Sequence, residues 1–264
     1  MTNVPLSDVP STVAQIRRMT ERGASLVRLA VMTVDDIPNL KSVIQQTEIP
    51  LCADIHFDYR IALGAIEAGI HKIRINPGNI GSEDRTREVV RAAKDRGIPI
   101  RIGVNGGSID RKKYSSPTPE ALVDSALSHV VILEDLGFED IVVSIKASDV
   151  MRTVEANELF ASKRDYPLHV GLTEAGYGLA CTVQSSIAIG SLLLKGLGDT
   201  IRVSLTGDPV EEIDIGYEIL SSLGLVEHVG AVEPRRRAPR HPLRAAGARA
   251  PAGRRPGREA RRGV

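Results

Sequence analysis

Two hydrophobic periodicities alternate along residues 11–223. Short apolar runs, typical of buried strands, are followed by longer segments in which apolar residues recur every three or four positions, as on one face of a helix. The stretch 51–81 contains one complete unit, with a strand at 51–57, a helix at 59–68 and a second strand at 72–75. Because a helix returns the chain after each strand, the strands are predicted to be parallel.

Repetition of this unit predicts an α/β fold of the TIM-type (β/α)8 barrel class that lacks its first strand. The predicted strands are 26–31, 51–57, 72–75, 99–104, 140–147, 168–173 and 200–205. The predicted helices are 11–23, 34–46, 59–68, 83–96, 119–136, 148–162, 182–195 and 209–223. Nothing in residues 1–10 alternates or runs apolar. Either the true start therefore lies upstream, or the sheet is open and its first and last strands have unpaired edges.

The composition restricts which residues can form the core and indicates where in the cell the protein is expected. Aromatic residues make up 3% of the sequence and Trp is absent, so the core must come from Ile, Leu, Val and Ala. No N-terminal targeting signal is visible, and the longest apolar run, 187–194, is far too short to span a membrane, so we expect a cytoplasmic protein. Cys52 and Cys181 occur without a C-x-x-C motif, and we expect both to pack in the core rather than form a disulfide or a metal site.

Charge divides the chain into two parts. Residues 231–264 carry 11 Arg and 2 Glu, a net charge of +9, so residues 1–230 carry −8. Of the 34 residues in the tail, 28 are Arg, Ala, Pro or Gly, a composition that cannot build a core. We therefore predict a barrel domain over 1–230 and a disordered tail over 231–264. The GC-rich codons of those four residues favour out-of-frame sequence over the alternatives, a basic arm for nucleic acid or an inert extension.

Candidate site residues gather where the predicted strands end, which is where parallel barrels place their active sites. Within each strand they are spaced to share one face. They are Arg28, Asp54, His56, Arg74, Asn76, Arg101, Asn105, Ser144, Lys146, Arg202 and Ser204, with His169, Thr173 and Glu174 on the remaining strand.

The candidate residues include five cations and two acids, Asp54 and Glu174. Because like charges repel strongly at low dielectric, the cations predict a bound anion, and Arg forks suit more than one phosphate. The glycine-rich loops 76–81 and 103–108 could bring backbone N–H groups to that anion. Glu174 is either a proton donor to a leaving oxygen or a capping or salt-bridging carboxylate. His56 either binds phosphate or donates a proton, or is a core histidine bonded to Asp54.

At these motifs the chain resembles the hydroxymethylbutenyl diphosphate synthase family, IspG, also called GcpE, of the methylerythritol phosphate route to isoprenoids. The matching segments are ADIHFDYRIAL, IRINPGNIG, IPIRIGVNGGS, VSIKASDV, LTEAG, and GDTIRVSL followed by DPVEEI, within residues 1–228. Residues 1–3 resemble the end of the family's first strand. The resemblance implies an oxidoreductase whose barrel binds 2-C-methyl-D-erythritol 2,4-cyclodiphosphate and opens its ring reductively. Glu174 would be the acid/base, and Arg28, His56, Arg74, Arg101, Asn105, Lys146, Arg202 and Ser204 would hold the diphosphate.

The resemblance also implies a 4Fe-4S cluster, ferredoxin or flavodoxin as reductant, and a homodimer in which the cluster domain of one subunit closes the barrel of the other. The cluster ligands of the family are a C-P-T-C pair, a third Cys and a Glu beyond the barrel. No C-P-T-C occurs here, and the Arg-rich tail begins where that domain should start. We therefore expect a barrel without its cluster, catalytically incompetent alone and at best a weak dimer. The alternatives are another phosphate-binding barrel enzyme, such as an aldolase with Lys146 as a Schiff base or a pterin synthase-like enzyme, and a nucleic-acid-binding module using the tail.

Overall fold

The computed structural model describes residues 1–76, 80 and 82–227. The tail 231–264 and part of the loop 76–81 lie outside the described residues, so the predictions made for them are not tested. None of the described helices is long and apolar enough to cross a membrane.

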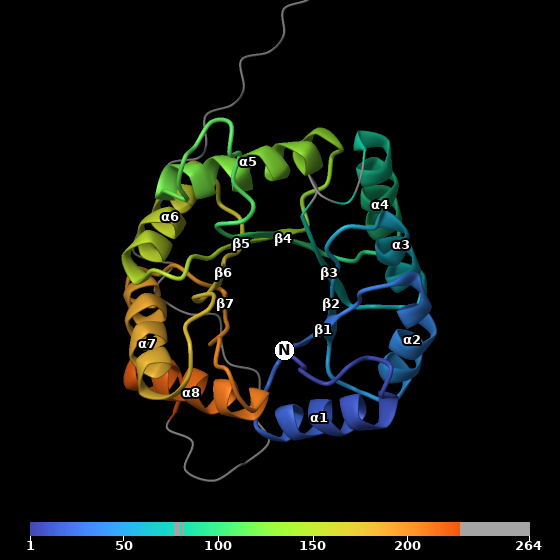
Figure 1. The fold of residues 1–264 in the computed structure, drawn as a ribbon, viewed down its shortest axis with the longest axis horizontal. Helices are drawn as coiled ribbons and strands as arrows, with labels where there is room; N and C mark the ends of the chain where they lie inside the picture. The colour runs from blue at the N-terminus through green and yellow to red at the C-terminus, as the bar shows by residue number, and fades with distance from the viewer. Residues whose placement is uncertain (77–79, 81, 228–264) are drawn as a thin grey trace, which may run out of the picture.

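Strands and helices alternate along the described chain in the predicted order and number. The strands are β1 (Val27–Ala30), β2 (Leu51–Asp54), β3 (Lys72–Ile75), β4 (Ile100–Val104), β5 (Ile141–Ile145), β6 (His169–Val170) and β7 (Thr200–Ile201). The helices are α1 (Val9–Glu21), α2 (Ile37–Gln45), α3 (Tyr59–Glu67), α4 (Glu83–Asp95), α5 (Pro119–Asp135), α6 (Val150–Lys163), α7 (Gly178–Leu194) and α8 (Pro209–Ser222), with a 3-10 turn η1 (Val34–Asp36) before α2. In Figure 1 the helices surround a ring of strands, which is the predicted TIM-type barrel.

The parallel strands follow one another around the ring in chain order. Strands β1 to β5 form one sheet, and β6 pairs with β7 in a second. The two sheets meet at a bridge between Val143 and Leu168, where the Val143 amide donates to the carbonyl of Pro167 at 2.9 Å. Backbone bonds also continue past the last ladder pair, from Thr173 N–H to Ala147 O at 3.1 Å.

Several strands are shorter than predicted. The apolar run 200–205 forms only the two-residue strand β7, and the run 168–173 only the two-residue strand β6. Apolar runs thus mark where strands lie, whereas their length depends on partners that the run itself does not specify.

Residues 1–3 lie beside β1, where a barrel would have its first strand. The amide of Thr2 donates to the carbonyl of Arg28 at 3.0 Å, and the side chain of Asn3 donates to the carbonyl of Gly207 at 3.2 Å. In Figure 1 the N-terminus lies inside the ring, between β1 and the segment that follows β7. These residues therefore cover the edge of β1 that the sequence left unpaired.

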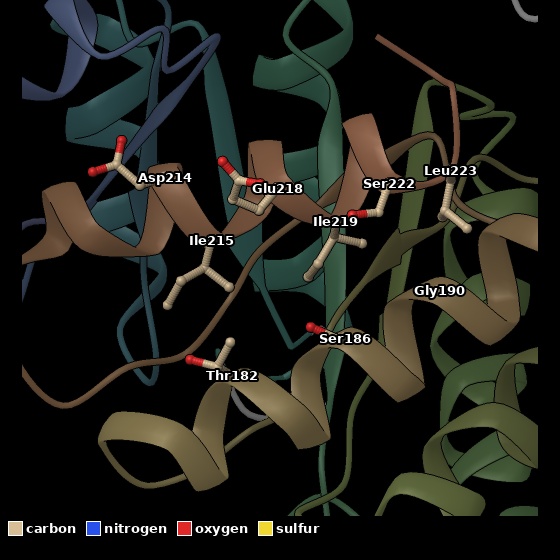
Figure 2. A pocket seen from close by; sticks show the side chains of 9 residues that line it. All are labelled: Thr182, Ser186, Gly190, Asp214, Ile215, Glu218, Ile219, Ser222 and Leu223. Carbon is tan, nitrogen blue, oxygen red and sulfur yellow. The ribbon is translucent and has the colours of Figure 1, made fainter. Parts of the chain in front are cut away.

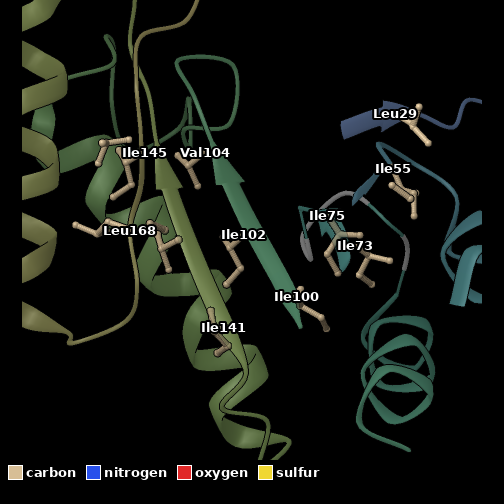
Figure 3. Packing of buried hydrophobic residues seen from close by; sticks show 14 of the residues in the cluster. Leu29, Ile55, Ile73, Ile75, Ile100, Ile102, Val104, Ile141, Ile145 and Leu168 are labelled. Carbon is tan, nitrogen blue, oxygen red and sulfur yellow. The ribbon is translucent and has the colours of Figure 1, made fainter. Parts of the chain in front are cut away.

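The two faces of the strands differ in polarity. The outward face buries a row of aliphatic side chains against the helices, shown in Figure 3: Leu29, Ile55, Ile73, Ile75, Ile100, Ile102, Val104, Ile141, Ile145 and Leu168, all 0–3% exposed. Alternate residues point into the ring, and there the register places Asp54 level with Arg74 and Arg74 level with Arg101. The apolar core lies between strands and helices, and the polar face lines the inside of the ring.

Gly171 allows β6 and β7 to approach closely. A Cβ atom at this position would lie 2.1 Å from the carbonyl oxygen of Arg202, and its φ of +154° is one that side-chain-bearing residues rarely adopt. The Arg202 amide donates to Val170 O at 3.0 Å across the same contact. The absence of a side chain at residue 171 is therefore required for these two segments to pack this closely.

Replacing Gly171→Ala should lower the free energy of unfolding by about 1–3 kcal/mol, because the added methyl group forces two backbones apart. Urea denaturation measures the change. Gly190→Ala is the matched control: a methyl group on Gly190 in α7 would meet no atom within 4 Å, and alanine is the better helix former by about 1 kcal/mol, so this variant should be at least as stable as the wild type. Equal losses in the two variants would contradict the argument.

Candidate anion-binding site

Five cationic side chains converge inside the ring: Arg28 on β1, Arg74 on β3, Arg101 on β4, Lys146 just after β5 and Arg202 just after β7. The pKa of Arg28 is lowered to about 10. Burial is the main cause, attraction to Asp54 opposes it, and repulsion from Arg101, Arg202 and Arg74 adds to it. The register, which places Asp54 level with Arg74 and Arg74 level with Arg101, likewise brings these side chains together. That the cations form a binding site for an anion stays a prediction.

Asp54, at the end of β2, is the carboxylate that ties two of these cations together. It accepts a hydrogen bond from Arg74 Nη1 at 3.0 Å, and Arg28 Nε and His56 Nε2 each lie 3.6 Å from its Oδ2. Burial opposes ionisation of this carboxyl, but the interaction with His56 and the charges of Arg28 and Arg74 outweigh it and hold its pKa below the usual range. His56 itself is half-exposed and lies at the rim.

Gly103 fixes the position of Arg74. The guanidinium donates from Nη2 to the Gly103 carbonyl at 3.1 Å, and a Cβ atom on Gly103 would lie 2.2 Å from Arg74 Nε. The glycine therefore makes room for an arginine in the next strand. Approach of the loop N–H groups to an anion, the role expected from the sequence, stays a prediction.

Four buried donors in the ring have no hydrogen-bond partner among the described residues: Arg101 Nε, Lys146 Nζ, His169 Nε2 and Arg202 Nε. Arg101 and Lys146 are 4% and 7% exposed, so water does not solvate them freely. Leaving a buried donor unpaired costs about 1–3 kcal/mol, and more for a charged group. Such a set of unpaired donors is typical of a site that binds a ligand with several hydrogen-bond acceptors.

Glu212 on α8 is a second acid of the cluster that the sequence analysis did not select. Its Oε1 lies 3.7 Å from Arg202 Nη2 and accepts the Leu205 amide at 3.1 Å. Arg202 Nη2 also donates to Ser204 Oγ at 3.1 Å. Candidate residues were expected at strand ends only, whereas Glu212 reaches the ring from a helix. Its position in the segment DPVEEI, which carries part of the family resemblance, was the feature that could have identified it.

The other predicted residues occupy different positions around the ring. Asn76 and Ser144 are buried at 6% and 5% exposure. Asn105 closes its own loop, because its Oδ1 accepts from the Gly107 amide at 3.0 Å and from Ser108 Oγ at 3.3 Å. Glu174 is exposed after β6 and is the one non-glycine residue of the described chain with a positive φ, at 55°. A non-glycine residue held in this conformation is often functional.

Both cysteines pack in the core, as predicted. Cys52 and Cys181 are free and fully buried. Burial raises the pKa of the Cys52 thiol, and the thiol of Cys181 donates to the Ser204 carbonyl at 3.2 Å. Cys181 thereby supports the segment that carries Ser204.

A separate cavity of about 300 Å³ lies on the outside of the barrel between α7 and α8 (Figure 2). Apolar and hydroxyl side chains line it together with Asp214 and Glu218, and no cation does. Asp214 is paired at 3.0 Å with Arg22, the residue that follows α1. With two acids and no cation in its lining, this cavity does not suit an anion.

Residues 1–217 match the family profile of the GcpE TIM-barrel domain. The chain belongs to the GcpE family. Relatives named 4-hydroxy-3-methylbut-2-en-1-yl diphosphate synthase (flavodoxin) include one from Clostridium perfringens, 54% identical over 230 residues, and one from Acidithiobacillus ferrooxidans, 56% identical over 228 residues. The matched region covers 86% and 85% of this chain but 66% and 62% of those proteins. This GcpE chain therefore spans less than two thirds of the length of the curated relatives it matches.

Solved structures agree on the architecture of the GcpE barrel. The chain resembles dihydropteroate synthase from Yersinia pestis with a TM-score of 0.59 and 14% identity, over 82% of this chain and 90% of that one. It resembles a truncated 3-deoxy-D-arabino-heptulosonate 7-phosphate synthase from Thermotoga maritima with a TM-score of 0.57 and 11% identity, over 83% and 85%. At these identities the likeness shows the fold alone.

Replacing Asp54→Asn should lower the free energy of unfolding by about 3–5 kcal/mol at pH 7, because two buried guanidinium groups lose their counter-charge. The folded-state pKa of Asp54 is depressed, so its contribution is complete above the unfolded value of about 3.9 and is lost as the pH falls through the folded value. Urea denaturation from pH 8 to pH 3 should show a constant gap between wild type and variant that narrows only below about pH 4.

Asp58→Asn is the matched control for that experiment. Asp58 is an N-cap of α3 that accepts the Arg60 amide at 2.9 Å, and asparagine caps equally well. The control should therefore stay close to wild type across the range. A gap for Asp54→Asn that grows steadily towards low pH would contradict the assigned role of Asp54.

Replacing Glu174→Gly should raise the free energy of unfolding by about 1 kcal/mol, since glycine adopts a positive φ without steric strain. Glu174→Ala keeps the Cβ atom and should not stabilise the protein. Thermal and urea unfolding of the pair separate backbone strain from loss of the carboxylate. Equal stability of the two variants would show that the backbone at this position is unstrained.

Proposed function

We propose that this chain is the substrate-binding barrel of a 4-hydroxy-3-methylbut-2-en-1-yl diphosphate synthase, and that it holds 2-C-methyl-D-erythritol 2,4-cyclodiphosphate inside the strand ring. The name of the relatives supports the activity. The observation that carries the proposal is the set of buried, unpaired donors that face the inside of the ring. Phosphate oxygens are acceptors only, and a diphosphate offers several of them to several strands at once.

Charge balance also favours a diphosphate. Arg28, Arg74, Arg101, Lys146 and Arg202 line the ring, while Asp54 and Glu212 are the acids that pair with them. The cations outnumber the acids even before the ligand is considered. A ligand with two negative charges compensates two of the three excess positive charges, whereas a neutral sugar or an amine would compensate none.

Roles divide between the buried interior of the ring, here called the floor, and its solvent-exposed edge, here called the rim. The buried cations, with Ser204, His56, Asn76, Asn105 and Ser144, would bind the phosphates and the sugar-derived hydroxyl. Glu174, exposed at the rim, would donate a proton to the hydroxyl oxygen that leaves as water. Such a donor must reach the reacting atom without being trapped in an ion pair, and its exposed position is compatible with that requirement.

The 4Fe-4S cluster that the family resemblance implies does not fit the residues of this chain. Such a cluster needs several thiolate ligands, and the sequence holds two cysteines, both buried as thiols within the barrel. The described residues offer no group of three side chains suited to a metal ion. In this proposal the two-electron step, with the flavodoxin named for the relatives, lies outside residues 1–264, and the barrel alone binds substrate without turnover in the cytoplasm.

A second candidate, a Schiff-base aldolase barrel, is favoured by one observation. The Lys146 amine is buried and unpaired, and burial together with the charges of Arg202, Arg101 and Arg28 lowers its pKa well below the usual value. Such amines are nucleophilic at neutral pH. Cleavage of a small phosphorylated aldol substrate, with borohydride trapping of Lys146 during turnover, is expected if this candidate is correct. The diphosphate-binding barrel should give no cleavage, whether or not its amine is trapped.

Replacing Arg101→Gln should weaken binding of the cyclodiphosphate roughly 10- to 100-fold, because a charged hydrogen bond of about 1.5–3 kcal/mol is lost. Isothermal titration calorimetry measures the dissociation constant. Arg22→Gln is the control, since Arg22 is half-exposed just after α1 and pairs with Asp214 outside the ring. Equal affinity in all three proteins would refute the assignment, and a stoichiometric 4Fe-4S absorption spectrum of the purified chain would refute the absence of the cluster.

A further inference from the structure

Lys146 and Arg101 are the two most deeply buried cations of the ring. Lys146 is 7% exposed and its Nζ has no hydrogen-bond partner among the described residues. The side chain follows β5, whose end is held by a bond from the Lys146 amide to Val104 O at 3.0 Å. Nζ lies 3.3 Å from where a side chain on Gly171 would begin, so the amine sits directly against the backbone of β6.

The charged groups facing this amine come from every neighbouring element. They are Arg28 on β1, Arg101 on β4, His169 on β6, Arg202 after β7 and Glu212 on α8. Glu212 is the acid among them, and it is already engaged by Arg202, by the Leu205 amide and by the N-terminal amine of Met1, which lies 3.5 Å from its Oε2. Lys146 therefore meets three guanidinium charges with no carboxylate of its own.

The guanidinium groups cannot relieve this repulsion by losing protons, because arginine stays charged in proteins. The amine can. Burial, then Arg202, Arg101 and Arg28, lower the pKa of Lys146, and the charge of Glu212 opposes them only in part. Two other groups are able to yield. Burial and then Lys146 lower the pKa of His169, whose Nδ1 bonds Thr200 Oγ1 at 2.8 Å. Burial also lowers the pKa of the N-terminal amine of Met1 to about 6, so loss of the proton uptake in Lys146→Met is what assigns the uptake to Lys146.

We propose that Lys146 is a neutral amine in the unliganded barrel and becomes an ammonium when the diphosphate binds, so that ligand and proton are taken up together. The inference rests on the proposed function, since it requires an anion in the ring. The proton comes from solvent to Nζ, and no bond of the ligand is made or broken. The dianion supplies the counter-charge that the protein does not give to Lys146.

The sign of the pH dependence follows. Where the free amine is neutral and the bound amine is charged, binding consumes one proton, and affinity falls by up to about tenfold for each unit rise in pH. Below the free-state value the amine is charged in both states and the affinity levels off. A cyclic diphosphate keeps one strongly acidic group on each phosphorus, so the ligand itself does not titrate near neutral pH.

Calorimetric titration of the full chain with 2-C-methyl-D-erythritol 2,4-cyclodiphosphate, from pH 6 to pH 9 in PIPES, HEPES and Tris, tests the proposal. These buffers differ in ionisation enthalpy, so the measured heat reports the number of protons taken up. Wild type should take up close to one proton in the range where the affinity falls with pH. Lys146→Met should bind more weakly with no uptake, and Lys146→Arg should bind without pH dependence. His169→Gln should retain the uptake.

Two results separate the inference from the proposed function. Tight binding with no proton uptake and a flat pH profile would overturn the inference and leave the diphosphate site in place. A ligand-independent measurement covers the case of no binding: the carbon-13 shift of Lys146 Cε in the free chain, assigned from the Lys146→Met spectrum, should titrate well below pH 10. An amine that stays protonated throughout that range overturns the inference whatever the ligand does.

Discussion

Repulsion between like charges in a confined polar space is the constraint on which this structure depends. Isolated buried cations are unstable in a protein interior, and five of them in one ring would push the strands apart. The fold resists because Arg28, Arg74 and Arg101 sit on strands whose opposite faces pack buried aliphatic side chains against the helices. Apolar burial on the outside of the ring thus holds the charge on the inside in place.

The two acids pair with some of the cations but do not neutralise the net positive charge of the ring. Asp54 binds Arg74 and lies near Arg28 on one side of the ring, and Glu212 lies near Arg202 on the other. Arg101 and Lys146, between them along the ring order, have no such partner. Partial compensation of this kind keeps the protein folded while leaving donors free for a ligand. The Lys146 amine, whose charge Glu212 compensates only in part, is the group proposed to lose its proton.

The sequence predicted the barrel because its two periodicities are strong and local. Alternation of apolar and polar residues within each strand also predicted that Arg74 and Arg101 share a space, since parity alone decides the face in parallel strands. Contacts that depend on tertiary approach were not accessible in this way. Glu212 enters from a helix, and Gly103 lacks a side chain because an arginine of another strand lies over it. Residues 1–3 are held by contacts with Arg28, Gln15 and Glu212, and only the family resemblance, not their own pattern, indicated a strand position for them.

Floor and rim of the ring meet different physical demands, which bears on how the proposed reaction is organised. The floor is buried, densely charged and held by fixed register, so it suits the part of the substrate that does not change. The rim is where Glu174 is exposed on strained backbone and His56 is half in solvent. Groups that move protons need such freedom, because a carboxylate locked among arginines would lose its basicity. Binding energy gained at the floor can therefore orient the reacting bond at the rim.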